Sequence, residues 1–472
     1  MKEPIRLYNS YTRSKDIFKT KEEGKVSMYT CGPTVYHFAH IGNLRTYIME
    51  DVLEKFFRLY GYDVKRVMNI TDVGHLSSDA DEGEDKMLKG AKREHKTVLE
   101  IAKYYTDAFF SDCNKLNIKY PDVVEPATNL IPEYINMVQV LLDKGYAYFS
   151  NGNVYFDTSK LENYYVFNDF TEEDLEVGVR ESVTEDLSKK NKADFVLWFT
   201  KSKFEDQALK WDSPWGTGYP GWHIECSCIS MKHLGEYLDI HCGGIDNQFP
   251  HHTNEIAQSE SFLGHEWCNQ WFHVYHLNDE TGKMSKSKGE FLTVSLLEEK
   301  GYNPLVYRFF CLQSHYRKVL AFSFDALDNS KLAYEKLVEK IANLKINEND
   351  IIEEKALEEI KDKFLNALCH DLNTSSAITV IYDALKYNTN DKTKREMIKE
   401  LDKVLSLNLI EEAAKIEHKE SDIPEEILKL VEERVKAKKE KNFALSDEIR
   451  DKVKEMGYTI KDTPNGPEVL KD

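Results

Sequence analysis

Four residues in three separate segments have side chains that could hold one metal ion. They are Cys31, Cys226, His251 and Glu255. Thiolate, imidazole and carboxylate groups are all good zinc ligands. If Pro250 begins a helix, His251 and Glu255 stand four residues apart and share one face of it. These segments predict a zinc site; the alternative is buried structural cysteines and a surface His–Glu pair.

Two neighbouring side chains are expected to point away from that ion. On a regular helix His252 lies about 100° round from His251, and Cys228 lies about 200° round from Cys226. Because the paired positions differ so much in direction, we exclude His252 and Cys228 from the predicted ligand set.

The segment His37-Phe38-Ala39-His40-Ile41-Gly42-Asn43 reads as a strand-to-helix turn that could bind a nucleotide. A helix N-terminus presents free N–H groups and a positive dipole end, which suits a triphosphate. Gly42 would let an adenine approach the backbone closely. His37 and His40 could donate to phosphate oxygens. The alternative is an ordinary turn that happens to contain histidines.

A second segment, Lys283-Met284-Ser285-Lys286-Ser287, suits a loop that folds over phosphates. Lys286 could neutralise the charge that develops on them during transfer. The alternative is a solvated basic loop. A third segment, His241-Cys242-Gly243-Gly244-Ile245-Asp246, follows a predicted strand but is weak by itself.

The elements that would position these residues follow from periodicity and turn signals. Lys25 to Thr30 reads as a strand, a helix is expected from about Gly42 to a C-cap at Gly61, and Asp63 to Ile70 reads as a second strand. Apolar residues mark the helix at every fourth position: Leu44, Ile48, Val52 and Phe56. Two strands joined by a helix imply a parallel sheet. From Trp222 the pattern resumes, with a helix near Cys226–Leu234 and a strand at Tyr237–His241.

The rest of the chain divides by composition. Residues 120–212 hold turn signals and short aromatic runs, which predicts an insertion into the sheet domain of residues 1–119 and 213–328. Lys/Glu/Leu/Ile-rich stretches predict a helical bundle over residues 329–410. Residues 411–422 are charged and read as a linker. Residues 423–472 are expected to form a small α+β domain, a helical pair opened by Pro424 and then a hairpin.

Composition limits the class of protein. None of the 472 residues falls in an apolar run of about 18, so no membrane span is predicted. The N-terminus lacks a secretory signal, and eight scattered cysteines do not suggest a disulfide framework, so we expect a cytoplasmic protein. The net charge of −19 argues against nucleic-acid binding unless a basic surface is local.

The nucleotide segments, in this order, resemble the HIGH and KMSKS motifs of class I aminoacyl-tRNA synthetases, with Asn43 in place of the last histidine. Within that class, three further patterns resemble the cysteinyl-tRNA synthetases: Thr30-Cys31-Gly32-Pro33-Thr34-Val35-Tyr36, Gly221-Trp222-His223-Ile224-Glu225-Cys226 and Phe249-Pro250-His251-His252-Thr253-Asn254-Glu255-Ile256-Ala257-Gln258.

The resemblance implies a fold and a reaction. The fold is α/β, a Rossmann-like doubly wound parallel sheet with an insertion, followed by a helical bundle that binds the anticodon stem and a C-terminal anticodon-binding domain. The reaction is ATP-dependent ligation of L-cysteine to tRNA(Cys) through a cysteinyl adenylate, by a monomer. One Zn²⁺ per chain would select the substrate thiolate, because a snug pocket alone separates such small side chains only about 10- to 200-fold. Mg²⁺ would accompany ATP.

The resemblance also assigns roles to residues. The catalytic residues it implies are His40, Asn43, Lys283 and Lys286. The ATP-binding residues are His37, His40, Gly42, Asn43, Gly243, Asp246 and Lys286. Thr71, Trp222 and His241 would line the cysteine pocket beside the metal ligands Cys31, Cys226, His251 and Glu255. No side chain is identified as the general base for transfer to the tRNA.

A local basic cluster in the C-terminal segment favours anticodon contact, although acidic residues interleave with it and a solvated helix face is the alternative. Its members are Arg434, Lys436, Lys438, Lys439, Lys441, Arg450, Lys452 and Lys454.

Three rival functions stay open. One is a cysteine ligase of the mycothiol pathway, which makes the same adenylate but lacks this segment. The others are a simple nucleotidyltransferase and a non-catalytic zinc or RNA-binding protein.

Overall fold

The computed structural model describes residues 3–73, 97–167, 188–201, 209–279, 282–283, 292–421, 424–463 and 466–471. Within these residues, no helix combines the length and the hydropathy that crossing a bilayer requires.

The centre of the molecule is a five-stranded sheet in which every neighbouring pair is parallel. Its spatial order is β11 (Cys268–Val274), β10 (Leu238–Gly244), β3 (Lys25–Thr30), β4 (Asp63–Ile70) and β5 (Val123–Pro126). The parallel α/β prediction is confirmed. The order reverses between β3 and β10, and in open α/β sheets ligands bind beyond the carboxyl ends of the strands at such a point.

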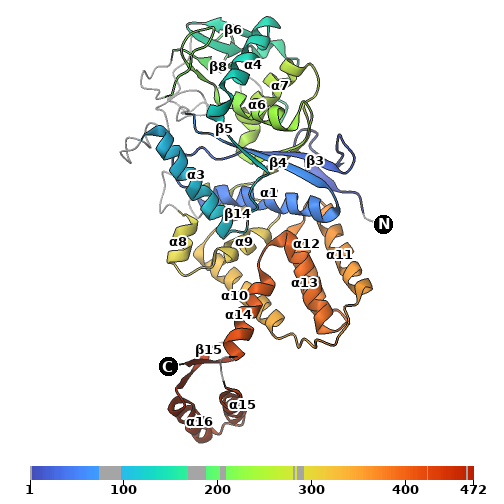
Figure 1. Ribbon diagram of the computed structural model, residues 1–472, viewed down its shortest axis with the longest axis vertical. Coiled ribbons are helices and arrows are strands. Elements are labelled where there is room, and N and C mark those ends of the chain that lie inside the picture. The colour runs from blue at the N-terminus through green and yellow to red at the C-terminus, as the bar shows by residue number, and fades with distance from the viewer. Residues whose placement is uncertain are drawn as a thin grey trace.

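Helices cover both faces of this sheet (Figure 1). α1 (Ile41–Tyr60) packs beneath it, and its predicted stripe of Leu44, Ile48, Val52 and Phe56 is fully buried. Gly61 ends α1 with a φ of 118°, which is the left-handed cap that the sequence predicts. α6 (Trp222–Leu234) and α7 (Thr253–Leu263) lie on the opposite face, beside α4 (Ile131–Asp143).

An antiparallel sheet lies beyond α6 and α7. It consists of β6 (Ala147–Ser150), β7 (Asn153–Phe156), β8 (Phe195–Phe199) and β9 (Tyr219–Pro220). The range 120–212 predicted as the insertion contains most of this sheet, but it also contains β5, which belongs to the parallel sheet.

A small three-stranded sheet lies next to α1. β12 (Leu277–Asp279) pairs with β13 (Gly282–Lys283) on one side and with β14 (Leu320–Ala321) on the other. α8 (Val294–Glu299) and α9 (Pro304–Leu312) lie between β13 and β14 in the chain.

Five helices follow, drawn from yellow to orange in Figure 1. They are α10 (Phe324–Ala342), α11 (Glu354–Cys369), α12 (Thr374–Lys386), α13 (Asp391–Leu405) and α14 (Leu409–Ser421). The linker predicted at 411–422 is wrong, since α14 occupies most of it. Leu409 and Ala413 are fully buried and Ile416 packs against the same core, so a narrow apolar stripe outweighs the charged composition.

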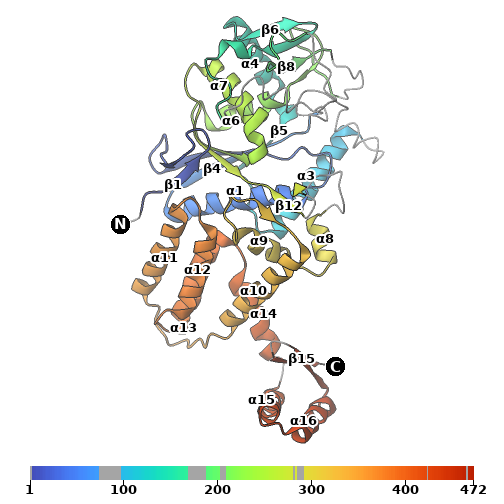
Figure 2. The same cartoon turned by 180° about the vertical axis from the view of Figure 1, so that it is seen from behind.

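The C-terminal unit lies at the end of the molecule farthest from the antiparallel sheet in both views (Figures 1 and 2). α15 (Glu425–Lys439) and α16 (Phe443–Glu455) precede an antiparallel hairpin of β15 (Tyr458–Thr463) and β16 (Gly466–Lys471), which confirms the predicted helical pair and hairpin. The unit has its own core, which includes Ile427, Ile449, Val453 and Ile460.

Candidate functional site

The four predicted metal ligands meet where the sheet order reverses. Cys31 follows β3, Cys226 lies on α6, and His251 and Glu255 lie before and on α7. The Sγ atoms of Cys31 and Cys226 are 3.9 Å apart, and Cys226 Sγ is 3.5 Å from His251 Nε2. His251 Nε2 is 2.9 Å from Glu255 Oε1. All four ligand atoms lie within 4.8 Å of one another.

These separations fit one tetrahedral ion. Zinc binds sulfur, nitrogen and oxygen at about 2.0–2.3 Å, which places neighbouring ligand atoms of a tetrahedron roughly 3.3–3.8 Å apart. The 3.9 Å and 3.5 Å separations at Cys226 are close to that range, and the 2.9 Å separation at Glu255 needs a small outward movement. A donor set of two thiols, an imidazole and a carboxylate is of a kind that zinc prefers.

The expectation that His252 points away is wrong. His252 Nε2 lies 3.3 Å from Cys31 Sγ, and Cys31, His241, His252 and Glu255 form a second, overlapping cluster. The rotation of about 100° per residue does not apply to His251 and His252, because Pro250 does not begin a regular α-helix. Residues Gln248–His252 form a wider π-type turn, and α7 begins only at Thr253.

The exclusion of Cys228 is confirmed. Its sulfur lies 3.8 Å from Met137 Sδ, on the side of α6 that faces α4, and burial raises the pKa of its thiol well above the usual value. Cys228 is therefore a packed apolar residue.

The ionisation of the cluster favours metal binding. Burial alone would raise the pKa of Cys226, but the Cys31 thiol and the His251 imidazole outweigh it and lower the pKa to about 7. Burial alone would also raise the pKa of Glu255, but His241 and His251 lower it to about 2. One thiolate and one carboxylate are thus available near neutral pH. Burial and Cys226 raise the pKa of Cys31, so a metal must displace that proton when it binds.

The three residues predicted for the cysteine pocket lie around this cluster at different depths. The Trp222 ring stacks on His251 at 4.2 Å and lines the cavity described below. His241 is fully buried and lies 2.8 Å from Glu255 through its Nε2. Thr71 is also buried; its hydroxyl donates to Glu225 and accepts from Asn69. Trp222 therefore lines the cavity, whereas His241 and Thr71 are buried behind it and contact Glu255, Asn69 and Glu225.

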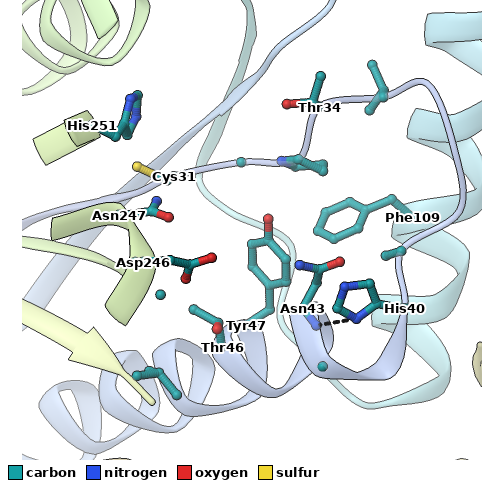
Figure 3. A pocket seen from close by; sticks show the side chains of 18 of the residues that line it. Cys31, Thr34, His40, Asn43, Thr46, Tyr47, Phe109, Asp246, Asn247 and His251 are labelled. Carbon is teal, nitrogen blue, oxygen red and sulfur yellow. Dashed lines mark hydrogen bonds between the residues drawn. The ribbon is translucent and has the colours of Figure 1, made fainter. Parts of the chain in front are cut away.

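A cavity of about 300 Å³ joins the metal cluster to the predicted nucleotide segments. Its lining includes six predicted residues in addition to Cys31, Cys226, His251 and Trp222: His37, His40, Gly42, Asn43, Gly243 and Asp246. Cys31, His251 and Asp246 lie on one side of the view in Figure 3, His40 and Asn43 lie on the other, and Tyr47 stands between them. Lys286 lies outside the described residues. Lys283 is described only by its backbone, which pairs with Asn278.

The helix N-terminus at this cavity has fewer free donors than the sequence suggests. Asn43 N–H donates to His40 Nδ1 at 3.2 Å, and Ile41 N–H donates to the carbonyl of Leu292 at 2.9 Å. Two of the first three N–H groups of α1 are therefore already bonded. Because His40 Nδ1 accepts a hydrogen bond, neutral His40 carries its proton on Nε2, where it can serve as a donor.

Two glycines are required by close packing in the cavity wall. A Cβ on Gly42 would lie 2.9 Å from His40 Nδ1, and a Cβ on Gly243 would lie 2.9 Å from His252 Cε1. Both positions lack room for a side chain beside these imidazole rings.

Several cavity residues were not predicted from the sequence. They include Thr34, Tyr47, Asn69, Phe109 and Asn247. Tyr47 stands four residues after Asn43, a helical spacing that could have revealed it. Asn69 accepts from Gly32 N–H at 2.7 Å and so fixes the turn that carries Cys31, but nothing local in the sequence indicates this contact.

Comparison with known proteins identifies similar chains. The family described as the tRNA synthetases class I (C) catalytic domain matches residues 17–332. The cysteine–tRNA ligase of Treponema denticola is 46% identical over 97% of this chain and 98% of its own length. The cysteine–tRNA ligase of Borrelia garinii subsp. bavariensis is 44% identical over 98% of this chain and 99% of its own.

A solved structure shares the fold. The methionyl-tRNA synthetase of Mycobacterium tuberculosis in complex with methionyl-adenylate superposes with a TM-score of 0.54, covering 83% of this chain and 93% of that one. At 16% identity the likeness concerns the fold alone.

Proposed function

From the premise that the chain belongs to the cysteine–tRNA ligases, which are class I aminoacyl-tRNA synthetases, we propose that one zinc ion bound by Cys31, Cys226, His251 and Glu255 selects its amino acid. The enzyme ligates L-cysteine to tRNA with ATP, through a cysteinyl adenylate. The observation that carries the zinc proposal is the convergence of those four side chains, three of which, Cys31, Cys226 and His251, also line the cavity.

The chemistry of selection supports zinc. Cysteine differs from serine by one atom, and a shaped apolar pocket separates such small differences by only about 10- to 200-fold. A zinc ion in the cluster supplies a soft Lewis acid that binds a thiolate and discriminates against a hydroxyl. Trp222, stacked on His251, shapes the space beside that ligand. We assign Thr71 and His241 to the same pocket, where they hold Asn69 and Glu255 in place.

In the first step, the negative charge that develops on the phosphates of ATP lies beside residues of this chain. The substrate carboxylate attacks the α-phosphate of ATP, which enters with Mg²⁺, and pyrophosphate leaves in line. His40 donates from Nε2, and the α1 dipole favours the negative charge. Asn43, which replaces histidine in the motif, can donate through its amide. His37, Gly42 and Gly243 line the nucleotide part of the cavity, with Asp246 towards the ribose. Lys283 and Lys286 complete the set by neutralising the phosphates.

Replacing Lys286 with alanine should lower the turnover number of ATP–pyrophosphate exchange by on the order of 10²–10³-fold, because one charged group that stabilises the transition state is lost. The Michaelis constant for cysteine should stay unchanged, since Lys286 is assigned to phosphate. Steady-state exchange assays with varied cysteine measure both quantities. An unchanged turnover number would remove Lys286 from the mechanism.

In the second step, the 2′-hydroxyl of the terminal adenosine of the tRNA loses its proton and attacks the carbonyl carbon of cysteinyl adenylate. The cysteinyl ester forms, the mixed anhydride breaks, and AMP leaves. We assign the helices of residues 329–410 to the anticodon stem and residues 423–472 to the anticodon itself. The basic cluster there differs from its sequence expectation, because Arg434, Lys438 and Arg450 all bond Asp462. Hydrogen bonds from Arg434 and Lys438 hold the pKa of Asp462 well below its usual value. These three cationic side chains therefore stabilise the fold of the C-terminal unit, and we assign the RNA contacts to other exposed side chains.

Phe443 is one such group. It is 62% exposed at the start of α16, directly after Lys441 and Asn442, and an exposed aromatic ring beside basic residues suits stacking on a nucleobase. Phe443→Ala should weaken tRNA binding by about 1–3 kcal/mol, which is the usual cost of losing one stacked base. Filter binding with tRNA measures this, and Leu445→Ala, 41% exposed in the same turn, is the matched control. Equal affinities for the two variants would contradict the assignment.

The proposal also covers the oligomeric state and the cellular location of the enzyme. We propose a monomer that acts in the cytoplasm, in which the insertion begins after β5 and not at residue 120, because β5 pairs with β4 of the parallel sheet. A cysteine ligase of the mycothiol type is disfavoured because such enzymes lack the C-terminal segment that this chain has. Supplying purified enzyme with cysteine, ATP and either tRNA or a glucosaminyl-inositol tests the acceptor: ester formation on tRNA alone is expected.

A further inference from the structure

Arg45 is a fully buried arginine on α1, between Asn43 and Tyr47, which both line the nucleotide cavity. Its Nη1 donates to the carbonyl oxygens of Tyr275 at 2.7 Å and His276 at 2.6 Å. Its Nη2 donates to the carbonyl oxygens of His315 at 3.3 Å and Lys318 at 2.8 Å. The two terminal nitrogens of a guanidinium carry four N–H groups, so each one serves a different carbonyl.

These carbonyls belong to two segments that meet at the cavity wall. Tyr275, His276 and Leu277 line the cavity and lead from β11 into β12. The segment 315–318 leads into β14, which pairs with β12. β12 also pairs with β13, which places the backbone of Lys283 opposite Asn278. Arg45 therefore binds the two segments that lead into β12 and β14, and β12 is the strand that pairs with the start of the KMSKS segment.

The same arginine belongs to the helix that begins with the other nucleotide motif. Gly42 stands three residues before Arg45, and a Cβ built on Gly42 would lie 3.7 Å from Leu277 Cβ, so the start of α1 packs directly on β12. His40 caps this helix start. A single side chain thus connects the helix of His40 and Asn43 to the wall formed by Tyr275 and His276.

We propose that Arg45 is a positioning residue for adenylation: it fixes the separation between the α1 N-terminus and the cavity wall that leads to Lys283. Burying an arginine among carbonyl groups is costly unless its donors are satisfied. The four N–H groups on Nη1 and Nη2 of Arg45 are bonded, and Nε–H has no partner among the described residues. Here the burial yields a rigid, planar connection that lysine cannot reproduce, because an ammonium has three N–H donors and no fixed fork. A displacement of about 1 Å in such a wall can lower the rate by as much as 10²-fold.

The test compares Arg45→Lys with Arg308→Lys in the full-length enzyme. Arg308 is equally buried and donates to the carbonyls of Leu116 and Leu405 and to Asp51, none of which lines the cavity. Both substitutions should lower the unfolding temperature. Only Arg45→Lys should raise the Kd for ATP and lower the turnover number of exchange, each by on the order of 10-fold. The zinc content and the Michaelis constant for cysteine should be unchanged in both.

This inference rests on the proposed function, because the exchange assay assumes that the enzyme forms cysteinyl adenylate. Calorimetry measures the Kd for ATP without that assumption. A failure of the proposed function and a failure of the Arg45 proposal can therefore be told apart. If Arg45→Lys unfolds at the assay temperature, Arg45→Gln measured at low temperature is judged by the same criteria. The proposal is overturned if a folded Arg45 variant keeps its ATP affinity and turnover number. It is also overturned if Arg308→Lys changes both quantities as much, because the effect would then be general destabilisation.

Discussion

Replacing Cys226 with serine should lower cysteine-dependent ATP–pyrophosphate exchange by more than about 100-fold, the upper end of what losing an outer-shell partner of a metal costs. A serine hydroxyl stays protonated and is a poor zinc ligand, whereas the Cys226 thiol has a pKa near 7 and lies 3.5 Å from His251 Nε2. The zinc content of the variant should fall in parallel, as atomic absorption would measure.

Cys228→Ser is the matched control for this substitution. It makes the same chemical change two residues away, on the side of α6 that faces Met137. It should cost some stability and leave the zinc content near one per chain. Affinity for tRNA should survive in both variants, because the metal cluster and the C-terminal unit lie at different ends of the molecule (Figure 1). Equal loss of zinc in the two variants, or loss of tRNA affinity in folded Cys226→Ser, would contradict this separation of roles.

Ending the chain after Ser421 should leave adenylate formation intact and reduce tRNA charging by on the order of 10²-fold or more, since specific contacts of a nucleic-acid module contribute at least that much to affinity. The removed unit has its own hydrophobic core, formed by α15, α16 and the hairpin, so its loss should not unfold the sheet domain. Exchange and charging assays on the same preparation measure the two activities.

The exchange activity serves as the internal control for the truncation. If exchange falls with charging, the remainder of the chain has been damaged and a shorter truncation at the start of β15 is needed to locate the cause. If charging is unchanged while exchange is normal, residues 423–472 are not a tRNA-binding unit.

The local elements were predictable because each carries its own signal. The four-residue spacing from Leu44 to Phe56 and the glycine at position 61 define α1, and β3 and β4 follow from short apolar runs. The sequence does not predict α14 because charged residues mask its few apolar positions, Leu409, Ile410, Ala413 and Ile416. The difference is physical: tertiary packing against α10 stabilises a helix that composition alone does not indicate.

The sequence predicts which residues form the candidate site better than it predicts how their side chains are oriented. The order of the motifs identifies Cys31, Cys226, His251 and Glu255 as candidate ligands. They become neighbours only because β10 lies beside β3 in the folded sheet. The direction of His252 depends on the π-type turn before α7, which single-residue periodicity does not describe. Likewise, the pairing of Arg434 with Asp462 joins residues 28 apart and converts an expected RNA contact into an internal ion pair.

Zinc-edge X-ray absorption, recorded with and without cysteine, tests the selection of the amino acid most directly. The enzyme alone should show two sulfur ligands, from Cys31 and Cys226, with His251 and Glu255 as the nitrogen and oxygen ligands. Saturating cysteine should add a third sulfur at about 2.3 Å, and saturating serine should add none. A sulfur count that stays at two with cysteine present, or a site without zinc in the active enzyme, would contradict selection by a metal-bound thiolate.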